Sequence, residues 1–102
     1  MLIALTAVAL SAAPAPAVLH LTIEGHRLSP SVLEAPAGQK LQLIVENKDS
    51  NAEEIESYAL NREKVVGPGK TVTLYLGPLD AGDYDLYGED HPDSAQATLT
   101  VR

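Results

Sequence analysis

Apolar residues recur at every second position in five segments of the chain. These segments are Leu19, Leu21 and Ile23; Leu41, Leu43 and Val45; Val72, Leu74 and Leu76; Tyr84 and Leu86; and Leu99 and Val101. A period of two places successive side chains on opposite faces of a strand, and it is typical of strands with one buried face. The pattern therefore predicts a half-buried β-strand in each segment.

Turn-forming residues separate these segments at short intervals. They are Ser29-Pro30, residues 36–38, residues 47–51, residues 67–69, Gly77-Pro78, residues 80–82 and residues 92–94. Many short strands with regular turns are typical of an antiparallel sandwich or barrel. Residues 59–64 are the one stretch with helical character, but they are too few for an independent helix. We expect an all-β fold in which residues 59–64 form a turn between sheets.

The predicted core is aliphatic, because the chain has no Phe or Trp and only four Tyr. A buried Tyr needs a partner for its hydroxyl group. Tyr84 lies two residues after Gly82, at the start of a predicted strand, where a corner tyrosine donates a hydrogen bond to the backbone upstream. We expect Tyr84 to make this bond.

Residues 1–17 resemble a secretory signal peptide. They carry no charge, and an apolar run leads into small residues and proline. A boundary after Ala17 avoids a proline directly beyond the cut, so residues 18–102 are expected to form the mature domain. The alternatives are a buried N-terminal strand, or a start site that omits a basic region. The apolar run is shorter than the roughly twenty residues that cross a bilayer, so no membrane insertion of the mature domain is expected.

Length and composition fit one small exported domain. The chain has 102 residues and no Cys, so it has neither a disulfide framework nor a thiolate for a blue-copper centre. Small domains without cysteine are common in the bacterial periplasm, which is the predicted location. The formal net charge of −7 argues against nucleic acid as a partner and favours cations or basic surfaces. Alternatively, the acidity only keeps the protein soluble.

Several segments together resemble the cupredoxin family. They are Leu28-x-Pro30, residues 32–41, residues 45–47 and Gly82-x-Tyr84-x-Leu86-Tyr87. Residues 53–57, 60–66 and 87–96 are similar to bacterial periplasmic cupredoxin-like proteins of the EfeO type, associated with ferrous iron uptake and with copper. The resemblance implies a Greek-key antiparallel β-sandwich whose metal ligands gather from loops at one end.

The resemblance also implies where ligands would stand. In blue-copper members one His follows a strand that ends in Asn, and a hairpin supplies Cys, then His three positions on, then an axial Met five further. Here Gly88 stands in the Cys place, His91 in the His place and Gln96 in the axial place, while the first His place falls near Glu54. Blue-copper electron transfer is therefore not expected. Imidazole and carboxylate instead suit copper(II), iron or zinc.

Six residues are candidate metal ligands: His91, Glu89, Glu54, Glu56, His26 and Gln96. His91 lies between two carboxylates in a predicted turn and is the first candidate; the alternative is a surface residue without a role. Glu54 and Glu56 share one side of a strand and could converge on a cation. The resemblance implies that Glu54 or Glu56, ahead of Glu53, points at the site. They could equally form a solvated acidic face.

The other two candidates are weaker. His26 lies just before Leu28, at the metal end implied by the resemblance, and is a second imidazole or a plain loop residue. Gln96 is an axial oxygen donor or a polar residue at a sheet edge.

No catalytic motif is present: there is no Gly-x-Ser-x-Gly and no glycine-rich loop before a helix, so the chain is expected not to be an enzyme. We predict a periplasmic protein that binds copper(II) or iron and supports metal transport or homeostasis. Its partners would be the metal ion and an inner-membrane metal transporter or its accessory proteins. The alternative is a metal-free acidic interaction module of a transport complex.

Overall fold

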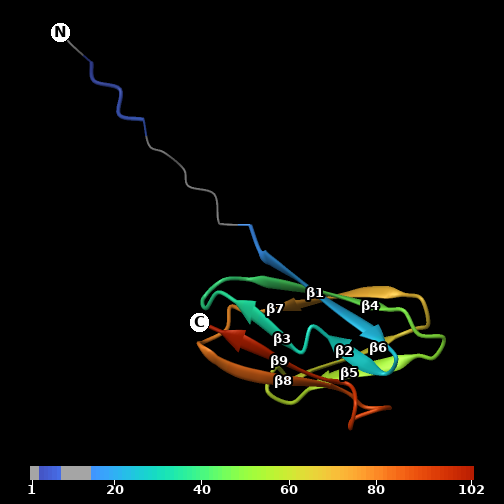
Figure 1. Cartoon of the computed structure of the whole chain (residues 1–102). Coiled ribbons are helices and arrows are strands. Elements are labelled where there is room, and N and C mark those ends of the chain that lie inside the picture. The colour runs from blue at the N-terminus through green and yellow to red at the C-terminus, as the bar shows by residue number, and fades with distance from the viewer. Residues whose placement is uncertain (1–2, 8–14) are drawn as a thin grey trace.

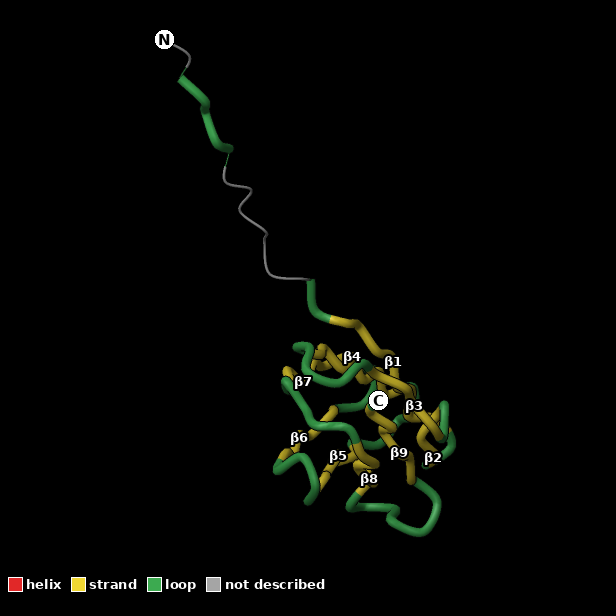
Figure 2. Tube along the Cα trace, turned by 90° about the vertical axis from the view of Figure 1, so that its left-hand side faces the viewer, coloured by secondary structure: helices red, strands yellow, loops and turns green. Residues whose placement is uncertain are grey.

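The computed structural model describes residues 3–7 and 15–102, and the second of these ranges forms two facing β-sheets (Figures 1 and 2). Within the described residues there are strands and turns and no helix. The strands are β1 (Ala17–Glu24), β2 (Arg27–Ser29), β3 (Val32–Ala35), β4 (Leu41–Asn47), β5 (Glu53–Ser57), β6 (Arg62–Val66), β7 (Thr71–Leu76), β8 (Gly82–Gly88) and β9 (Gln96–Val101).

One sheet has the strand order β2-β1-β4-β7 and the other the order β3-β9-β8-β5-β6. The predicted all-β sandwich is confirmed. Pairing is antiparallel except between β1 and β4 and between β3 and β9, which are parallel. Parallel neighbours need a crossover connection, and the chain supplies one, since β3 leaves the first sheet for the second between β1 and β4. The sandwich is thus mainly antiparallel, with two parallel pairs that the sequence pattern does not indicate.

The core lies between the sheets and is aliphatic, as predicted. Its most buried large side chains include Leu21, Ile23, Leu43, Leu86 and Leu99, each at most 1% exposed. Burying one such side chain contributes about 1.5–3 kcal/mol. All five segments with a period of two are strands, namely β1, β4, β7, β8 and β9.

Two local predictions have clear outcomes. Tyr84 Oη donates to the Asp80 carbonyl oxygen at 2.8 Å, which confirms the corner tyrosine. The segment 59–64 does not connect the two sheets: it ends a turn and begins β6, which pairs with β5 in the same sheet. Ser57 causes this tight return, because its Oγ accepts the Leu60 amide hydrogen at 3.1 Å.

β1 begins at Ala17, the last residue of the predicted signal peptide, and the Ala17 amide donates to the Lys40 carbonyl oxygen at 3.0 Å. Residues 3–7 have no regular structure, whereas residues 1–2 and 8–14 of the predicted signal peptide lie outside the described residues. No helix long and apolar enough to cross a membrane occurs in the part of the chain that is described. The signal peptide stays a prediction.

Candidate metal centre

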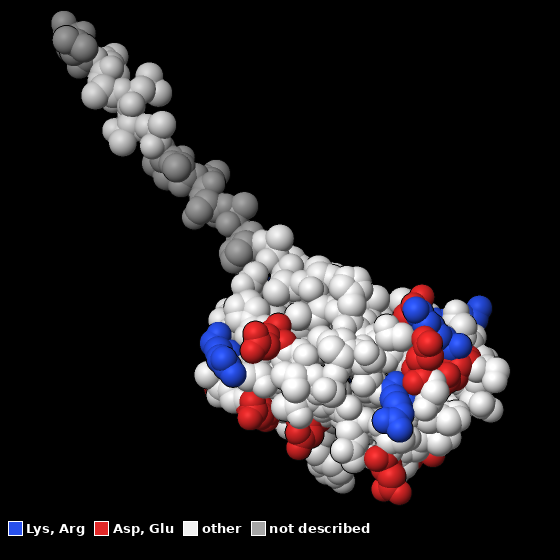
Figure 3. All heavy atoms as spheres, in the orientation of Figure 1, with Lys and Arg blue, Asp and Glu red and all other residues white. Residues whose placement is uncertain are grey.

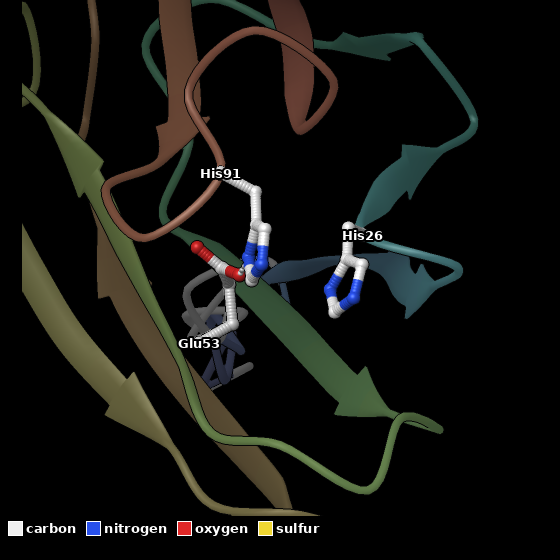
Figure 4. Close-up of side chains that lie close together, drawn as sticks. All are labelled: His26, Glu53 and His91. Atoms are coloured by element: carbon white, nitrogen blue, oxygen red, sulfur yellow. Dashed lines mark hydrogen bonds and ion pairs between the residues drawn. The ribbon is translucent and has the colours of Figure 1, made fainter.

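Two histidines from distant parts of the chain meet at one end of the sandwich. His26 lies in the turn between β1 and β2, and His91 lies in the loop between β8 and β9. Their rings stack, with centroids 3.7 Å apart and planes inclined by 18° (Figure 4). The side chains remain 42% and 34% exposed, so both are accessible from solvent.

Glu53 joins His91 from the interior. Glu53 begins β5 and is 1% exposed, on the same inward side as Ile55 and Ser57. Its Oε2 lies 2.6 Å from His91 Nδ1, and its Oε1 accepts the Asp90 amide hydrogen at 3.0 Å. A buried carboxylate is costly unless its oxygens are hydrogen-bonded, and both oxygens of Glu53 have such a partner.

Gly88, the last residue of β8, makes room for Glu53. A Cβ atom at position 88 would lie 2.8 Å from Glu53 Cδ and 2.7 Å from Ala95 Cβ, and closer still to Glu53 Oε1. These separations are well inside van der Waals contact, since carbon atoms pack best at about 3.5–4.0 Å. Any side chain at position 88 would therefore displace the carboxylate or the loop.

A second carboxylate holds His26. Asp49 accepts the amide hydrogens of Gly25 and His26 at 2.7 and 2.9 Å, and its Oδ2 lies 3.6 Å from His26 Nδ1. These amide groups, that of His26 foremost, lower the pKa of the Asp49 carboxyl group. The loops are also tied together directly, because Ser94 Oγ donates to the His26 carbonyl oxygen at 2.5 Å. Each imidazole thus has its own carboxylate.

Glu54, Glu56 and Glu89 form a separate cluster on the outward side of β5. One oxygen from each lies within 4.8 Å of the others. Burial, followed by the charge of Glu89, raises the pKa of Glu54, and a hydrogen bond with the Glu89 side chain is the main cause that raises the pKa of Glu56. Crowded carboxylates of this kind resist ionising together. In the view of Figure 3, charged side chains gather towards the two ends of the sandwich.

The six predicted ligands therefore do not form one site. His26 and His91 form one cluster with Glu53, whereas Glu54, Glu56 and Glu89 lie together on the other side of β5. Gln96 belongs to neither group, because its side-chain amide donates to the Pro92 carbonyl oxygen at 2.9 Å.

Glu53, ranked behind Glu54 and Glu56 in the sequence, is the carboxylate that meets His91. The alternation along β5 carried the signal, since Glu53 has the same phase as the buried Ile55.

The two-sheet fold is that of a cupredoxin-like domain. A family model described as cupredoxin-like domain matches residues 1–101, and the chain belongs to this family. The chain is 40% identical over 83 residues to an uncharacterised protein of Rickettsia prowazekii, covering 81% of this chain and 66% of that protein. It thus spans just under two thirds of that relative.

Solved structures show the same fold at low sequence identity. Auracyanin A, a blue copper protein of Chloroflexus aurantiacus, has a TM-score of 0.74 at 15% identity, covering 86% of this chain and all of that one. The metal-binding domain of CopA, a copper(I)-exporting ATPase of Streptococcus pneumoniae, also has a TM-score of 0.74, at 11% identity, covering 83% and 84% of the two chains.

The residues present do not fit a blue-copper centre. The chain has no Cys, the Cys place holds Gly88, and the Glu53 carboxylate fills the space that a side chain there would need. The two exposed imidazoles do fit a borderline metal ion such as copper(II).

Proposed function

We propose that this protein binds copper(II) through His26 and His91, as a binding protein and not an enzyme, and that it supports metal transport or homeostasis in the periplasm. The observation that carries the proposal is the contact of two accessible imidazoles, each with a carboxylate near Nδ1. Histidines that bind metals usually donate their other ring N–H to a carboxylate or carbonyl group. For His91 that arrangement leaves Nε2 free for a metal, whereas His26 Nδ1 lies 3.6 Å from Asp49 Oδ2, beyond hydrogen-bond distance.

The stacked rings must change their relative orientation to bind one ion. Nitrogen lone pairs lie in the ring plane, and planes inclined by only 18° do not direct two lone pairs at one point. His26 is the more exposed of the two and sits on a turn, so its ring is the one that rotates.

Copper(II) is the preferred ion, because in the Irving–Williams order copper(II) binds to nitrogen ligands more tightly than the other divalent metals of the first transition row. Iron is the competing ion that the narrower resemblance to EfeO-type proteins supports.

The transport role rests on the predicted signal peptide and on the family resemblance. Export to the periplasm would place the protein beside an inner-membrane metal transporter or its accessory proteins. The exposed position of both imidazoles at one end supports such a role, because a partner can reach the ion there.

Isothermal titration of the metal-free protein with copper(II), iron(III) and zinc(II) tests the proposal. We expect copper(II) to bind more tightly than millimolar, and His91→Ala or His26→Ala to weaken it at least about tenfold. His20→Ala is the matched control, since His20 is exposed on β1 and belongs to neither cluster. Binding that is absent, or that is unchanged in His91→Ala, refutes the proposal.

The outward carboxylates favour a second candidate, a metal-free module that docks a basic partner. Glu56 pairs across strands with Glu63 on one side and Tyr87 on the other, next to the Glu54 and Glu89 carboxylates. Exposed charge contacts weaken with ionic strength. This candidate predicts that binding of a basic partner falls with salt, is lost in Glu56→Gln and is indifferent to chelator.

A further inference from the structure

We propose that Glu53 is a positioning residue for His91: its carboxylate holds His91 as the tautomer with hydrogen on Nδ1 and leaves Nε2 free, and glycine at position 88 admits that carboxylate. The inference deepens the proposed function. Only the part that concerns copper(II) affinity, tested below as the metal arm, rests on that function.

The contacts of Glu53 determine the tautomer. An ionised carboxylate only accepts hydrogen bonds, and the Glu53 oxygens face the Asp90 amide and His91 Nδ1. The Asp90 amide can only donate. If Glu53 is ionised, its other oxygen also accepts, and His91 then carries its hydrogen on Nδ1. The same two bonds fix successive residues of the loop between β8 and β9.

The same contacts argue against Glu53 as a ligand. Both of its oxygens are engaged with the loop, and the residue is 1% exposed. No buried side-chain nitrogen or oxygen in the described residues lacks a hydrogen-bond partner, so Glu53 needs no ion to satisfy it. Glu53 therefore acts on a metal through His91.

Gly88 and Glu53 are alternatives for one space. Gly88 pairs with Ile55 across β8 and β5, and a Cβ at position 88 would overlap the Glu53 carboxyl group. A side chain at position 88, such as a thiolate, is thus incompatible with the buried Glu53. Thiolates select soft ions, so this pair of residues sets the site to nitrogen donors and to borderline ions such as copper(II).

Nuclear magnetic resonance of the metal-free protein tests the tautomer. Long-range ¹H–¹⁵N correlations would be recorded over a series of pH values, and the tautomer would be assigned from spectra in which the ring signals are those of neutral imidazole. We expect His91 to carry its hydrogen on Nδ1 in the natural protein.

Glu53→Gln is the decisive variant, because Gln has the same shape but one acceptor oxygen and one NH₂ group. Its oxygen accepts the Asp90 amide hydrogen and its NH₂ donates to Nδ1, which moves the His91 hydrogen to Nε2. The same tautomer in both proteins overturns the inference.

Copper(II) titration adds the metal arm. Glu53→Gln should weaken binding at least about tenfold, in the range seen when outer-shell partners of a ligand are removed. If the natural protein binds no copper(II) while the tautomer still switches, the proposed function fails and the positioning role stands. Unchanged affinity in a variant whose tautomer has switched overturns the metal arm.

A double-mutant cycle, in which the unfolding equilibrium of each variant is measured, tests whether Gly88 and Glu53 compete for the same space. Gly88→Ala alone should destabilise strongly, and Glu53→Ala should relieve part of that loss, since the Ala95 contact remains. We expect the coupling to exceed about tenfold in the unfolding equilibrium constant. In the matched Glu53→Gln background, where the side chain keeps its size, Gly88→Ala should be as harmful as in the natural protein. Additive effects of Gly88→Ala and Glu53→Ala overturn the shared-space claim.

Discussion

Asn47, the last residue of β4, holds the loop that supports the two-histidine site. It is completely buried, and its Nδ2 donates to the carbonyl oxygens of Asn51 and Val66 at 2.8 and 3.0 Å. Its Oδ1 accepts the Asp49 amide hydrogen at 2.9 Å. One side chain therefore ties residues 48–52 to β6 and positions Asp49 beneath the turn that carries His26.

Asn47→Ala should lower the free energy of unfolding by about 2–4 kcal/mol. Each of the three hydrogen bonds contributes about 1 kcal/mol net, and the Val66 carbonyl oxygen loses its Asn47 partner inside the protein, which adds to the cost. Small domains are stable by only about 5–15 kcal/mol in total. Copper(II) affinity should fall as well, although no imidazole is changed, because Asp49 and the turn at His26 lose their support.

Urea denaturation followed by circular dichroism measures the effect as a lower midpoint with an unchanged m value. Asn51→Ala is the control, since Asn51 is exposed and supplies only its backbone oxygen, so its effect should stay within about 0.5 kcal/mol. Asn47→Asp should be as harmful as Asn47→Ala, because it sets an oxygen against two carbonyl groups. A loss under about 0.5 kcal/mol in Asn47→Ala would refute the reasoning.

Three further predictions concern single polar groups. Tyr84→Phe loses the bond to Asp80 and should cost about 0.5–1.5 kcal/mol, seen as a lower melting temperature in calorimetry; an unchanged temperature contradicts it. Asp49 has a lowered pKa, so its stabilisation is present above its unfolded pKa and is lost as pH falls through the folded pKa; the stability gap to Asp49→Asn should close on acidification. The pKa of Glu56 is raised in the folded protein, chiefly by its hydrogen bond with the Glu89 side chain. Ionised Glu56 therefore lowers the stability of the fold: the loss is complete above the pKa of the folded state and absent below the pKa of the unfolded state. Glu56→Gln should therefore be more stable than the natural protein at neutral pH, and equal to it in acid; a gain that persists in acid contradicts this.

Five of the nine strands in the described residues could be predicted because their signal is local; they are β1, β4, β7, β8 and β9. Alternation in Leu41, Leu43 and Val45 depends only on which face of one strand is buried, and the structure confirms it. Pairing depends on residues far apart in the chain, so the parallel contact of β1 with β4 has no local signature. The role of the Ser57 hydroxyl group could not be predicted from the sequence either, because its hydrogen bond with the Leu60 amide forms only when the chain turns back.

The histidines of the site could be named from the sequence, but their contact could not. His26 and His91 are 65 positions apart, and only the docking of two loops, tied by Ser94, brings their rings together. The carboxylate beside His91 was not ranked first, because the family placement favoured Glu54 or Glu56 over Glu53. In the structure Glu53 contacts His91, whereas Glu54 and Glu56 lie with Glu89 in the other cluster.

Glu53 shows how a buried carboxylate can be recognised in a strand sequence. A Glu in phase with Ile55 predicts a carboxylate in the interior, which is stable only where both oxygens find donors and where a neighbouring strand leaves space. Gly88 supplies the space, and the two residues after Glu89 supply the donors. Gly88, which stands in the Cys place of the family pattern, therefore leaves interior space that the Glu53 carboxylate fills, and this carboxylate contacts His91 from the neighbouring strand.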